Sequence, residues 1–427
     1  MGCIRVVYES SMGYPWIIYR LSIGYLSVVR QDDRHCCLRF ISATLCLADI
    51  IFASINPFDL AKIIFTVTND LSYDQRMQRI CHSLATEGFE IVLVGRQLKD
   101  SIPIKKESYH QKRLHCFFTK GPAFYVEYNI RLFVYLLFRK TDMICAIDLD
   151  SILPCYFVSI VRNKKRVYDA HELFTEQKEI ISRPFIHSIW LMLEKFAVPR
   201  FKSGYTVNEF IQQEFRRRYK VDYAVIKNLP LLQTVNRKPE TGNSEPFIIY
   251  QGAVNEGRSF ETLIPAMKEI DSKLVICGKG NFFHTVRELI KENNVSEKVE
   301  LKGYLIPELL RELTPTARFG LTLFESAGLN QYQSLSNRFF DYIMAGIPQV
   351  CVDYPEYRKI NDEFEIALMI GNTETNTIVS AMNNLLDDDV LYERLRQNCL
   401  KARETLNWEH EEIKLKAFWK NIYTSSH

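Results

Sequence analysis

The residues best suited to do chemistry are an imidazole and several carboxyl groups that follow short apolar runs. His171 lies just after a predicted strand, within the sequence Tyr-Asp-Ala-His-Glu, and Asp148 and Asp150 end the strand before it. An imidazole at the carboxyl end of a strand can donate a hydrogen bond to a ligand hydroxyl or shuttle a proton. The alternative is a structural histidine bonded to its neighbours. The Asp-Leu-Asp spacing is too common to indicate a metal, and we predict no metal site.

Two glycine-containing turns further along the chain favour an anionic ligand. The first includes Gly252 and Gly257 and ends in Arg258, and the second includes Gly278 and Gly280. Backbone amides at such turns can approach a ligand closely, and the N-terminus of the next helix favours negative charge. Arg258 adds a planar fork suited to phosphate oxygens. The alternative is a pair of ordinary turns with a solvated arginine, because neither has the full G-x-G-x-x-G pattern.

A helix with an acid in its middle is predicted over residues 335–345. Its apolar residues recur at helical spacing, Gly346 and Pro348 end it, and a buried strand follows at residues 349–352. If the helix lines a cleft, Asp341 can accept hydrogen bonds from vicinal hydroxyls of a ligand. The alternative is an amphipathic helix with a solvated aspartate.

Polar residues also follow the first strand of the α/β region. They are Asn69, Asp70, Tyr73 and Arg76. We consider them candidates for contact with an acceptor or a phosphate. The alternative is a helix N-terminus with Asp70 near its start.

These residues are positioned by a strand–loop–helix pattern that starts near Lys62. The predicted strands of its first part are 63–67, 90–94, 114–118, 143–147, 166–168, 204–207 and 224–226, with helices 74–87, 126–138, 152–161, 186–197 and 209–219 between them. The second part has strands 247–250, 273–277, 299–301, 320–324 and 349–352, with helices 260–270, 283–293 and 307–313, and the chain ends in helices 375–386, 391–405 and 408–423. This alternation predicts two doubly wound α/β domains whose strand ends face a central cleft.

The composition narrows the class of protein. The chain has 427 residues, of which 47% are hydrophobic and 25% charged, and its net charge of +3 does not indicate nucleic acid. Its eleven cysteines lack metal spacing and predict reduced thiols in the cytoplasm. The most apolar early run, residues 40–55, is short for a transmembrane span. Residues 1–60 do not resemble the rest; they form either an atypical membrane-surface or partner-binding extension, or a start-site artefact.

Taken together, these segments resemble retaining glycosyltransferases of the GT-B type (glycosyl transferases group 1, family 4-like), which have two Rossmann-like domains and use nucleotide sugars. The resemblance rests on residues 168–172, 251–258, 277–280 and 337–348, in that order. With it, we predict an N-terminal acceptor domain (61–232), a polar linker (233–246), a C-terminal nucleotide-sugar domain (247–407) and a last helix (408–427) that packs back on the N-terminal domain.

The resemblance also implies roles for single residues. His171 matches the histidine that contacts the donor sugar near the reaction centre, Arg258 the diphosphate clamp, and Asp341 the acid, usually Glu, that binds the ribose hydroxyls. Asn69 and Asp70 fall in the loop that meets the acceptor or the donor phosphate, so Tyr73 and Arg76 are placed on the acceptor side with them. The full predicted donor-binding set is Gly252, Gly257, Arg258, Gly278, Gly280, Glu325, Asn337, Arg338 and Asp341.

The sequence departs from the family pattern in two ways that bear on the site. The family pairs its arginine with a nearby lysine, but here no lysine follows Arg258 before Lys268. The diphosphate charge would then be met by Arg258, helix dipoles and Arg338. The family also has a glutamate eight positions before the ribose acid, where this chain has Gln333; Glu325 looks like that motif but lies further upstream.

The sequence therefore predicts an enzyme, a transferase that moves a sugar from a nucleoside-diphosphate sugar to a hydroxyl acceptor, with retention and without a metal or other cofactor. Its partners would be the donor and a glycan or lipid-linked acceptor, in surface polysaccharide synthesis. Basic clusters at residues 200–202 and 216–220 could contact anionic lipid, which suggests a cytoplasmic protein peripheral to the inner face of the membrane. The alternatives are a sugar-nucleotide epimerase of the same architecture and a catalytically degenerate, nucleotide-sugar-binding partner subunit.

Overall fold

The computed structural model describes residues 61–425, except Tyr73, Asp100, 233–245 and Ala327, together with three strands nearer the N-terminus. Those strands, β1 (Arg5–Glu9), β2 (Pro15–Arg20) and β3 (Leu26–Val29), pair in an antiparallel sheet in that order. The other residues of the predicted N-terminal extension, Tyr73 and nearly all of the predicted linker lie outside the described part of the chain.

The N-terminal sheet has seven parallel strands in the order β10-β9-β8-β7-β4-β5-β6. Their bounds are β4 Lys62–Thr66, β5 Glu90–Gln97, β6 His110–His115, β7 Met143–Ile147, β8 Lys165–Ala170, β9 Ser203–Thr206 and β10 Ala224–Val225. Its helices are α2 Gln75–Thr86, α3 Gly121–Phe138, α4 Ile152–Val161, α5 Lys178–Ile181, α6 Pro184–Ala197 and α7 Glu209–Tyr219. The side-chain period of a strand explains the two layers: Ile64 packs with α3 and α4, whereas its neighbour Phe65 meets Trp419 on the other face.

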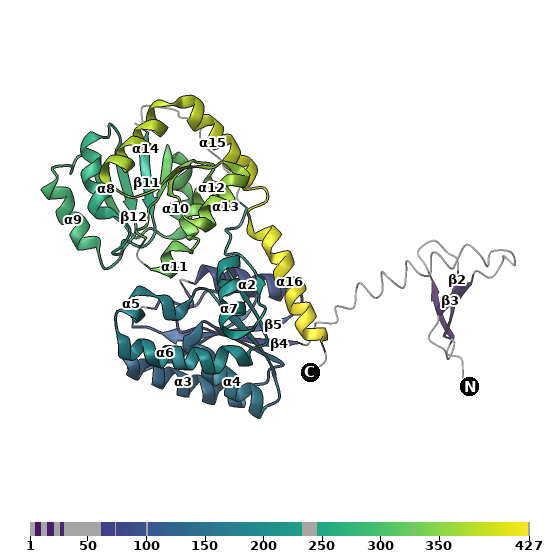
Figure 1. The fold of residues 1–427 in the computed structure, drawn as a ribbon. Coiled ribbons are helices and arrows are strands. Elements are labelled where there is room, and N and C mark those ends of the chain that lie inside the picture. The colour runs from purple at the N-terminus through teal and green to yellow at the C-terminus, as the bar shows by residue number, and fades with distance from the viewer. Residues whose placement is uncertain are drawn as a thin grey trace. The chain divides into compact units, whose positions relative to one another are not determined.

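The C-terminal sheet has six parallel strands in the order β13-β12-β11-β14-β15-β16. Their bounds are β11 Phe247–Gln251, β12 Lys273–Cys277, β13 Val299–Gly303, β14 Phe319–Thr322, β15 Gln349–Val352 and β16 Ala367–Ile370. Its helices are α8 Phe260–Ala266, α9 Phe283–Glu292, α10 Pro307–Leu313, α11 Leu329–Tyr332, α12 Asn337–Ala345, α13 Pro355–Phe364, α14 Thr375–Asp387 and α15 Asp389–Ala402. Figure 1 shows helices on both faces of each sheet, so the prediction of two doubly wound α/β domains is confirmed.

Some elements differ from the prediction. Strand β6 lies at His110–His115 rather than 114–118, because it is an edge strand whose side chains are mostly exposed and therefore leave little apolar signal. Helix α3 starts five residues early, at Gly121, with Pro122 in its first turn. Helix α13 and strand β16, which extend the C-terminal sheet after β15, were not predicted.

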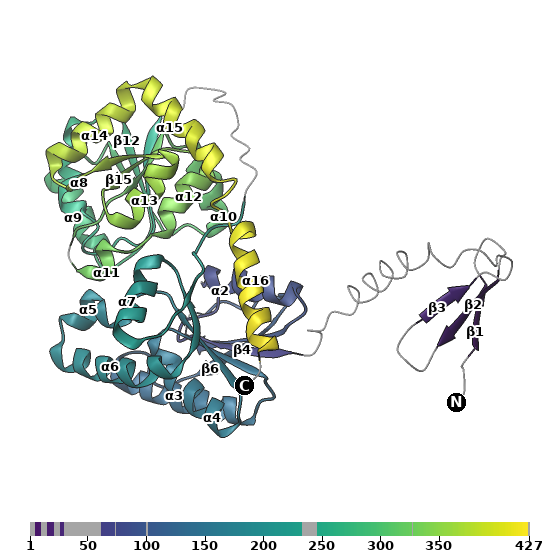
Figure 2. The same ribbon diagram turned by 45° about the vertical axis from the view of Figure 1, so that its right-hand side comes forward.

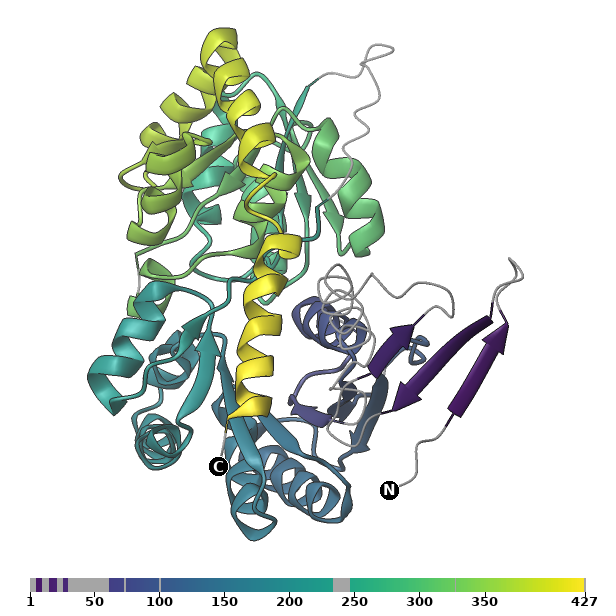
Figure 3. The same ribbon diagram turned by 90° about the vertical axis from the view of Figure 1, so that its right-hand side faces the viewer.

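The last helix, α16 (Trp408–Thr424), runs back along the N-terminal sheet, as Figure 3 shows. The indole nitrogen of Trp408 donates to Ser83 Oγ on α2 at 2.8 Å, and the ring of Trp419 lies 5.3 Å from that of Phe65. At the other end of the helix, Lys165 Nζ donates to the carbonyls of Ile422 and Tyr423, which the helix itself leaves unsatisfied. Helix α16, which follows the last helix of the C-terminal sheet, is therefore held against the N-terminal sheet along its length.

Among the residues that the structure describes, no helix is both long and apolar enough to cross a membrane. The cysteines that it describes are all free and buried, at positions 81, 116, 145, 155, 277, 351 and 399. This agrees with the prediction of reduced thiols for that part of the chain.

Candidate functional site

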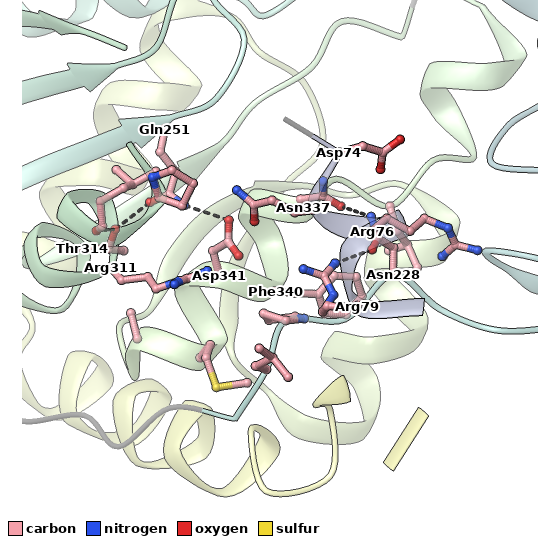
Figure 4. Close-up of a pocket in the computed structure, with 18 of the residues that line it drawn as sticks. Asp74, Arg76, Arg79, Asn228, Gln251, Arg311, Thr314, Asn337, Phe340 and Asp341 are labelled. Atoms are coloured by element: carbon pink, nitrogen blue, oxygen red, sulfur yellow. Dashed lines mark hydrogen bonds between the residues drawn. The ribbon is translucent and has the colours of Figure 1, made fainter. Parts of the chain in front are cut away.

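A cavity of about 540 Å³ is lined by residues of both sheets (Figure 4). The lining residues from the N-terminal α/β domain lie on α2 and in the loop after β8. Those from the C-terminal α/β domain lie at the end of β11 and on α10 and α12. The predicted site residues that line the cavity are Asn69, Arg76, His171, Asn337 and Asp341. The topology therefore brings together side chains that are up to 272 positions apart along the chain, from Asn69 to Asp341.

His171 lies between two carboxylates. Its Nδ1 is 3.3 Å from Asp148 and its Nε2 is 3.4 Å from Asp169, while its backbone amide donates to Asp148 at 2.9 Å. Burial alone lowers the pKa of the imidazole, but Asp148 and Asp169 outweigh burial and raise that pKa well above 6.5. The two carboxylates therefore favour the protonated imidazolium, whose Nε2 has no hydrogen-bond partner in the described part of the chain and can donate to a ligand oxygen.

Arg76 belongs to the same group of charges, because it contacts Asp169. Its Nη2 donates to the fully buried Asp169 at 2.9 Å. Burial raises the pKa of Asp169, but Arg76 and His171 outweigh it and the pKa falls below 3.8. Asp169 is thus an anion held between two cations, and Arg76 acts mainly on Asp169 although it also lines the cavity.

Asp341 faces the cavity from α12 and is held by a short chain of polar groups. Gln251, at the end of β11, donates from Nε2 to Asp341 Oδ2 at 2.9 Å, and its Oε1 accepts from Thr314 at 2.8 Å (Figure 4). Burial raises the pKa of Asp341 to about 6, and the cations Arg79, Arg311 and Arg338 limit the rise. Asp341 therefore lines the cavity as a carboxyl group with one side-chain hydrogen bond, from Gln251.

A second polar chain crosses the cavity near Asp341. Arg79 on α2 donates to Asn228 at 2.6 Å, and Asn228 donates to Asn337 at 2.8 Å. Burial lowers the pKa of Arg79 to about 10, an effect that Asp341 partly offsets. The guanidinium also lies 5.7 Å from the ring of Trp408, where α16 begins.

The two glycine turns pack on each other beside this cavity. The amide of Gly252 donates to Cys277 and that of Gly278 to Gly303. A side chain at Gly278 would collide with the carbonyl of Gly252, and Gly252 itself has a φ of +115°. Gly280 lies just as close to Val254 and Asn255 of the first turn. The glycines are therefore required for the close approach of the two loops.

Arg258 and Arg338 share one aromatic ring behind the first turn. Their guanidinium carbons lie 4.4 and 5.2 Å from the centroid of Phe324, and that of Arg338 also lies 4.2 Å from Tyr250. Arg338 is 6% exposed, and its Nη1 has no hydrogen-bond partner. Neither arginine lines the cavity of Figure 4, and the guanidinium of Arg338 lies next to Gly252.

Glu325 and Gly257 lie together next to Arg258. The amide of Glu325 donates to the carbonyl of Gly257 at 3.1 Å, and Gly257 has a φ of +79°. Glu325 thus lies next to the glycine turn that precedes Arg258, and it does not line the cavity of Figure 4. At Gln333 the backbone carbonyl accepts from Asn208 of the N-terminal sheet at 2.9 Å.

The acceptor-side residues divide between two places. Asn69 lines the cavity of Figure 4 and also a second cavity, of about 450 Å³, in the N-terminal α/β domain. Asp148 and Asp150 line this second cavity as well. Burial and the neighbouring Asp148 raise the pKa of Asp150 to about 7. Asp70 lines neither cavity, because its carboxylate pairs with Arg113 at 2.9 Å.

Sequence reasoning missed several cavity residues, namely Arg79, Asn228, Gln251, Arg311 and Thr314. Two of them had a usable signal. Gln251 is the last residue of a strand that we predicted, and strand ends face the ligand side of such sheets. Arg79 lies one helical turn after Arg76, on the same face of α2. Within the described residues, no cluster of three or more His, Cys, Asp or Glu is arranged to hold a metal ion.

Comparison with known proteins bears on the fold and on the C-terminal sheet. Residues 233–402 match the family model described as glycosyl transferases group 1. A curated relative, the N-acetylgalactosamine-N,N'-diacetylbacillosaminyl-diphospho-undecaprenol 4-alpha-N-acetylgalactosaminyltransferase of Campylobacter jejuni, is 27% identical over 150 residues. That match covers 34% of this chain and only 39% of the relative.

Solved structures are similar over more of the chain. Sucrose-phosphate synthase from Thermosynechococcus elongatus has a TM-score of 0.71 at 16% identity, over 86% of this chain and all of that one. Anabaena HepE in complex with UDP and glucose has a TM-score of 0.66 at 10% identity, over 86% of this chain and all of that one. The fold is that of GT-B glycosyltransferases, and the family match and the curated relative support a transferase.

Proposed function

We propose that this protein is a glycosyltransferase that moves a sugar from a nucleoside-diphosphate sugar to a hydroxyl acceptor with retention at the anomeric carbon. The observation that supports it most is the placement of Asp341 and His171 on one cavity from two different sheets. A carboxylate suits the paired hydroxyls of a ribose, and an imidazolium suits an oxygen of the sugar or diphosphate. A structural neighbour that holds UDP and glucose adds support for a nucleotide-sugar donor.

In this proposal the C-terminal sheet binds the donor. Asp341 accepts from the ribose hydroxyls while Gln251 fixes the orientation of its carboxylate. The diphosphate lies at the glycine turns, where backbone amides, Arg258 and Arg338 supply positive charge. Arg338 then takes over the part of the lysine that this chain lacks, because it is a buried cation beside Gly252.

The transfer itself needs few protein groups. The bond between the anomeric carbon and the diphosphate oxygen breaks, a bond from that carbon to the acceptor oxygen forms, and the acceptor proton passes to the departing diphosphate or to water. Catalysis would come from positioning and from stabilisation of the negative charge that develops on the diphosphate. We assign that stabilisation to Arg258 and His171, and the acceptor would enter beside Asn69.

We base the proposed acceptor on the relative from Campylobacter jejuni, whose name includes a sugar carried on diphospho-undecaprenol. A lipid-linked glycan of this class lies at a membrane surface, so we propose that the enzyme works there as a peripheral protein in the synthesis of a surface polysaccharide.

Donor binding is the direct test. Melting temperatures are measured with UDP, GDP, ADP and CMP on the wild type, on Asp341→Asn and on Asp387→Asn, an exposed aspartate of α14 that serves as the matched control. A ligand that binds the folded state raises the melting temperature by mass action. We expect one nucleotide to do so in the wild type and the control, with a smaller shift in Asp341→Asn. No shift with any nucleotide, or an equal shift in all three proteins, would reject the assignment of Asp341.

Turnover distinguishes the transferase from its alternatives. Labelled sugar nucleotide of the class selected above is incubated with and without a diphospho-polyprenol glycan acceptor. Product that requires the acceptor supports the transferase. Conversion of the donor to an isomer without acceptor identifies an epimerase, and binding without any conversion identifies a nucleotide-sugar-binding subunit.

A further inference from the structure

Helix α3 of the N-terminal sheet is apolar on two opposite faces. One stripe, Phe124, Tyr128, Leu132 and Leu136, is buried against the sheet. The other, Val126, Ile130, Val134 and Phe138, recurs at the same spacing but points outward, and Phe138 is 79% exposed. A helix that is apolar all round is normally covered on all sides. Nothing in the described part of the chain covers the outer stripe.

The helices beside α3 extend this apolar surface. Helix α6 exposes a stripe at i, i+4, i+7 and i+11, in which Phe185 is 76% and Met192 is 63% exposed. We define the outer face by all exposed apolar side chains of the three helices and the loop before α3, which are Phe117, Phe118, Val126, Ile130, Val134, Phe138, Phe157, Ile160, Val161, Phe185, Ile189, Met192 and Phe196.

Ring contacts link the three helices that carry the outer face. Phe157 of α4 lies 6.4 Å from Phe196 of α6, and Tyr125 of α3 lies 5.3 Å from Trp190 of α6. Figures 1 and 2 show α3, α4 and α6 side by side on one face of the N-terminal sheet. Soluble monomers rarely expose an apolar patch of this extent, so the face indicates an interaction surface.

Bases outnumber acids among the exposed charged side chains around the outer face, where Asp142, after Lys140, is an exposed acid. The acids of α3, α4 and α6 are Glu127, which pairs with Arg131, and Glu194, which is buried. The exposed charged side chains on and immediately beside these helices include many bases, namely Lys120, Arg139, Lys140, Arg183, Lys195, Arg200 and Lys202. An apolar surface with a basic rim complements an anionic lipid surface, in which acyl chains meet negatively charged headgroups.

We propose that the outer face docks this protein on the surface of a bilayer that contains anionic lipid. The apolar side chains of α3, α4 and α6 enter the boundary between headgroups and acyl chains, and the basic rim lies at the phosphates. A second copy of the chain fits less well, because a two-fold interface places the same basic rim against itself. The proposal rests on the peripheral membrane location proposed above and names the surface that provides it; vesicle binding needs no donor, so it can fail separately from the transfer reaction.

The test is sedimentation of the full chain with vesicles of phosphatidylcholine alone or with 30% phosphatidylglycerol. We expect binding to the anionic vesicles that weakens as salt rises, since the rim charges are screened. The double variant Phe138→Ser, Phe185→Ser removes two largely exposed rings and leaves the core intact, and we expect its binding to fall about tenfold or more. Val390→Ser, Ile413→Ser alters equally exposed apolar residues of α15 and α16 and serves as the control.

A second variant tests the rim. In Lys140→Glu, Lys195→Glu we expect weaker binding to anionic vesicles and little change in the melting temperature, because both side chains are exposed. The proposal would be overturned if the wild type failed to bind anionic vesicles, or if the ring variant and the rim variant both bound as well as the wild type. It would also be overturned if the wild type were a dimer that Phe138→Ser, Phe185→Ser dissociates, since the outer face would then be a subunit interface.

Discussion

The two walls of the cavity differ in how their carboxylates are neutralised. On the wall from the N-terminal sheet, the imidazolium of His171 and the guanidinium of Arg76 neutralise Asp148 and Asp169 within one compact group. On the opposite wall, burial holds the pKa of Asp341 at about 6, and its hydrogen-bond donor is the neutral amide of Gln251. Among the described residues, the first wall pairs its charges without a ligand, although His171 Nε2 and Asp169 Oδ2 lack a hydrogen-bond partner, whereas on the second wall Asp341 has no ion-pair partner and can accept from hydroxyls of a ligand.

Two buried arginines show the same difference between the two sheets, now for positive charge. Arg76 has a buried carboxylate partner at 2.9 Å, but Arg338, which is equally buried, stacks on Tyr250 and Phe324 and has a free Nη1. A buried cation without a counter-charge is costly unless an anion binds it. The C-terminal sheet thus leaves one acid and one base poorly compensated, which fits a ligand with hydroxyls at one end and phosphates at the other.

The largest effect on activity should follow from a substitution on the wall where His171 pairs with Asp148 and Asp169. In His171→Gln we expect the transfer rate to fall by about 10²–10³, because a charged donor near the reaction centre is lost. Donor affinity should change little, since the ribose and diphosphate contacts remain. Single-turnover rates and donor titrations on this variant and on His110→Gln, an exposed histidine of β6, separate the two quantities. A normal rate in His171→Gln would mean that the imidazole only holds Asp148 and Asp169 in place.

Replacement of Arg338 should have the next largest effect. Arg338→Met keeps an apolar contact with Tyr250 and Phe324 but removes the charge. We expect the affinity for the nucleoside diphosphate to fall about 10- to 100-fold, the value of one or two charge-assisted hydrogen bonds. Binding of the matching nucleoside, which lacks phosphate, should be unchanged in calorimetric titrations. If nucleoside and nucleotide weaken equally, Arg338 has a structural role and the phosphate contact is wrong.

The comparison also shows what the sequence could and could not predict. The positions of Asp341 and His171 on the cavity were predictable because each residue lies in a motif with its own helix or strand end. The glycine turns were predictable too, although the close packing of Gly278 on Gly252 was not. Gln251 was missed because its function comes from a contact with Asp341, 90 residues away, that no local pattern encodes.

Local patterns failed elsewhere for the same physical reason. Asp70 looked like a site residue because it follows the first strand, but Arg113 from β6 removes its carboxylate from both cavities. Strand β6 itself was misplaced because an exposed edge strand has no apolar alternation. The location of the Asp70 side chain depends on its pairing with a residue far along the chain, and the location of β6 depends on its place at the edge of the sheet. Local strand propensity determines neither.

The smallest and most specific effect concerns the pKa of Asp341. Because that pKa is about 6, the carboxylate that binds hydroxyls is lost as the pH falls. We expect donor affinity to be constant from pH 7 to 8 and to fall about tenfold by pH 5, as the ionised fraction decreases. Asp341→Asn should bind weakly at every pH and show no such dependence. Calorimetric titrations of the nucleotide at each pH measure both curves.

Stability should respond in the opposite direction. The folded pKa of about 6 lies above the unfolded value of 3.8, so the folded chain binds more protons between these values and is stabilised as the pH falls through 6. Asp341→Asn removes the cost of burying a charge and should therefore raise the melting temperature at pH 7–8, with little effect near pH 4. A substitution that stabilises the protein while it weakens the donor identifies a ligand-binding acid; one that weakens both would show that Asp341 serves the fold alone.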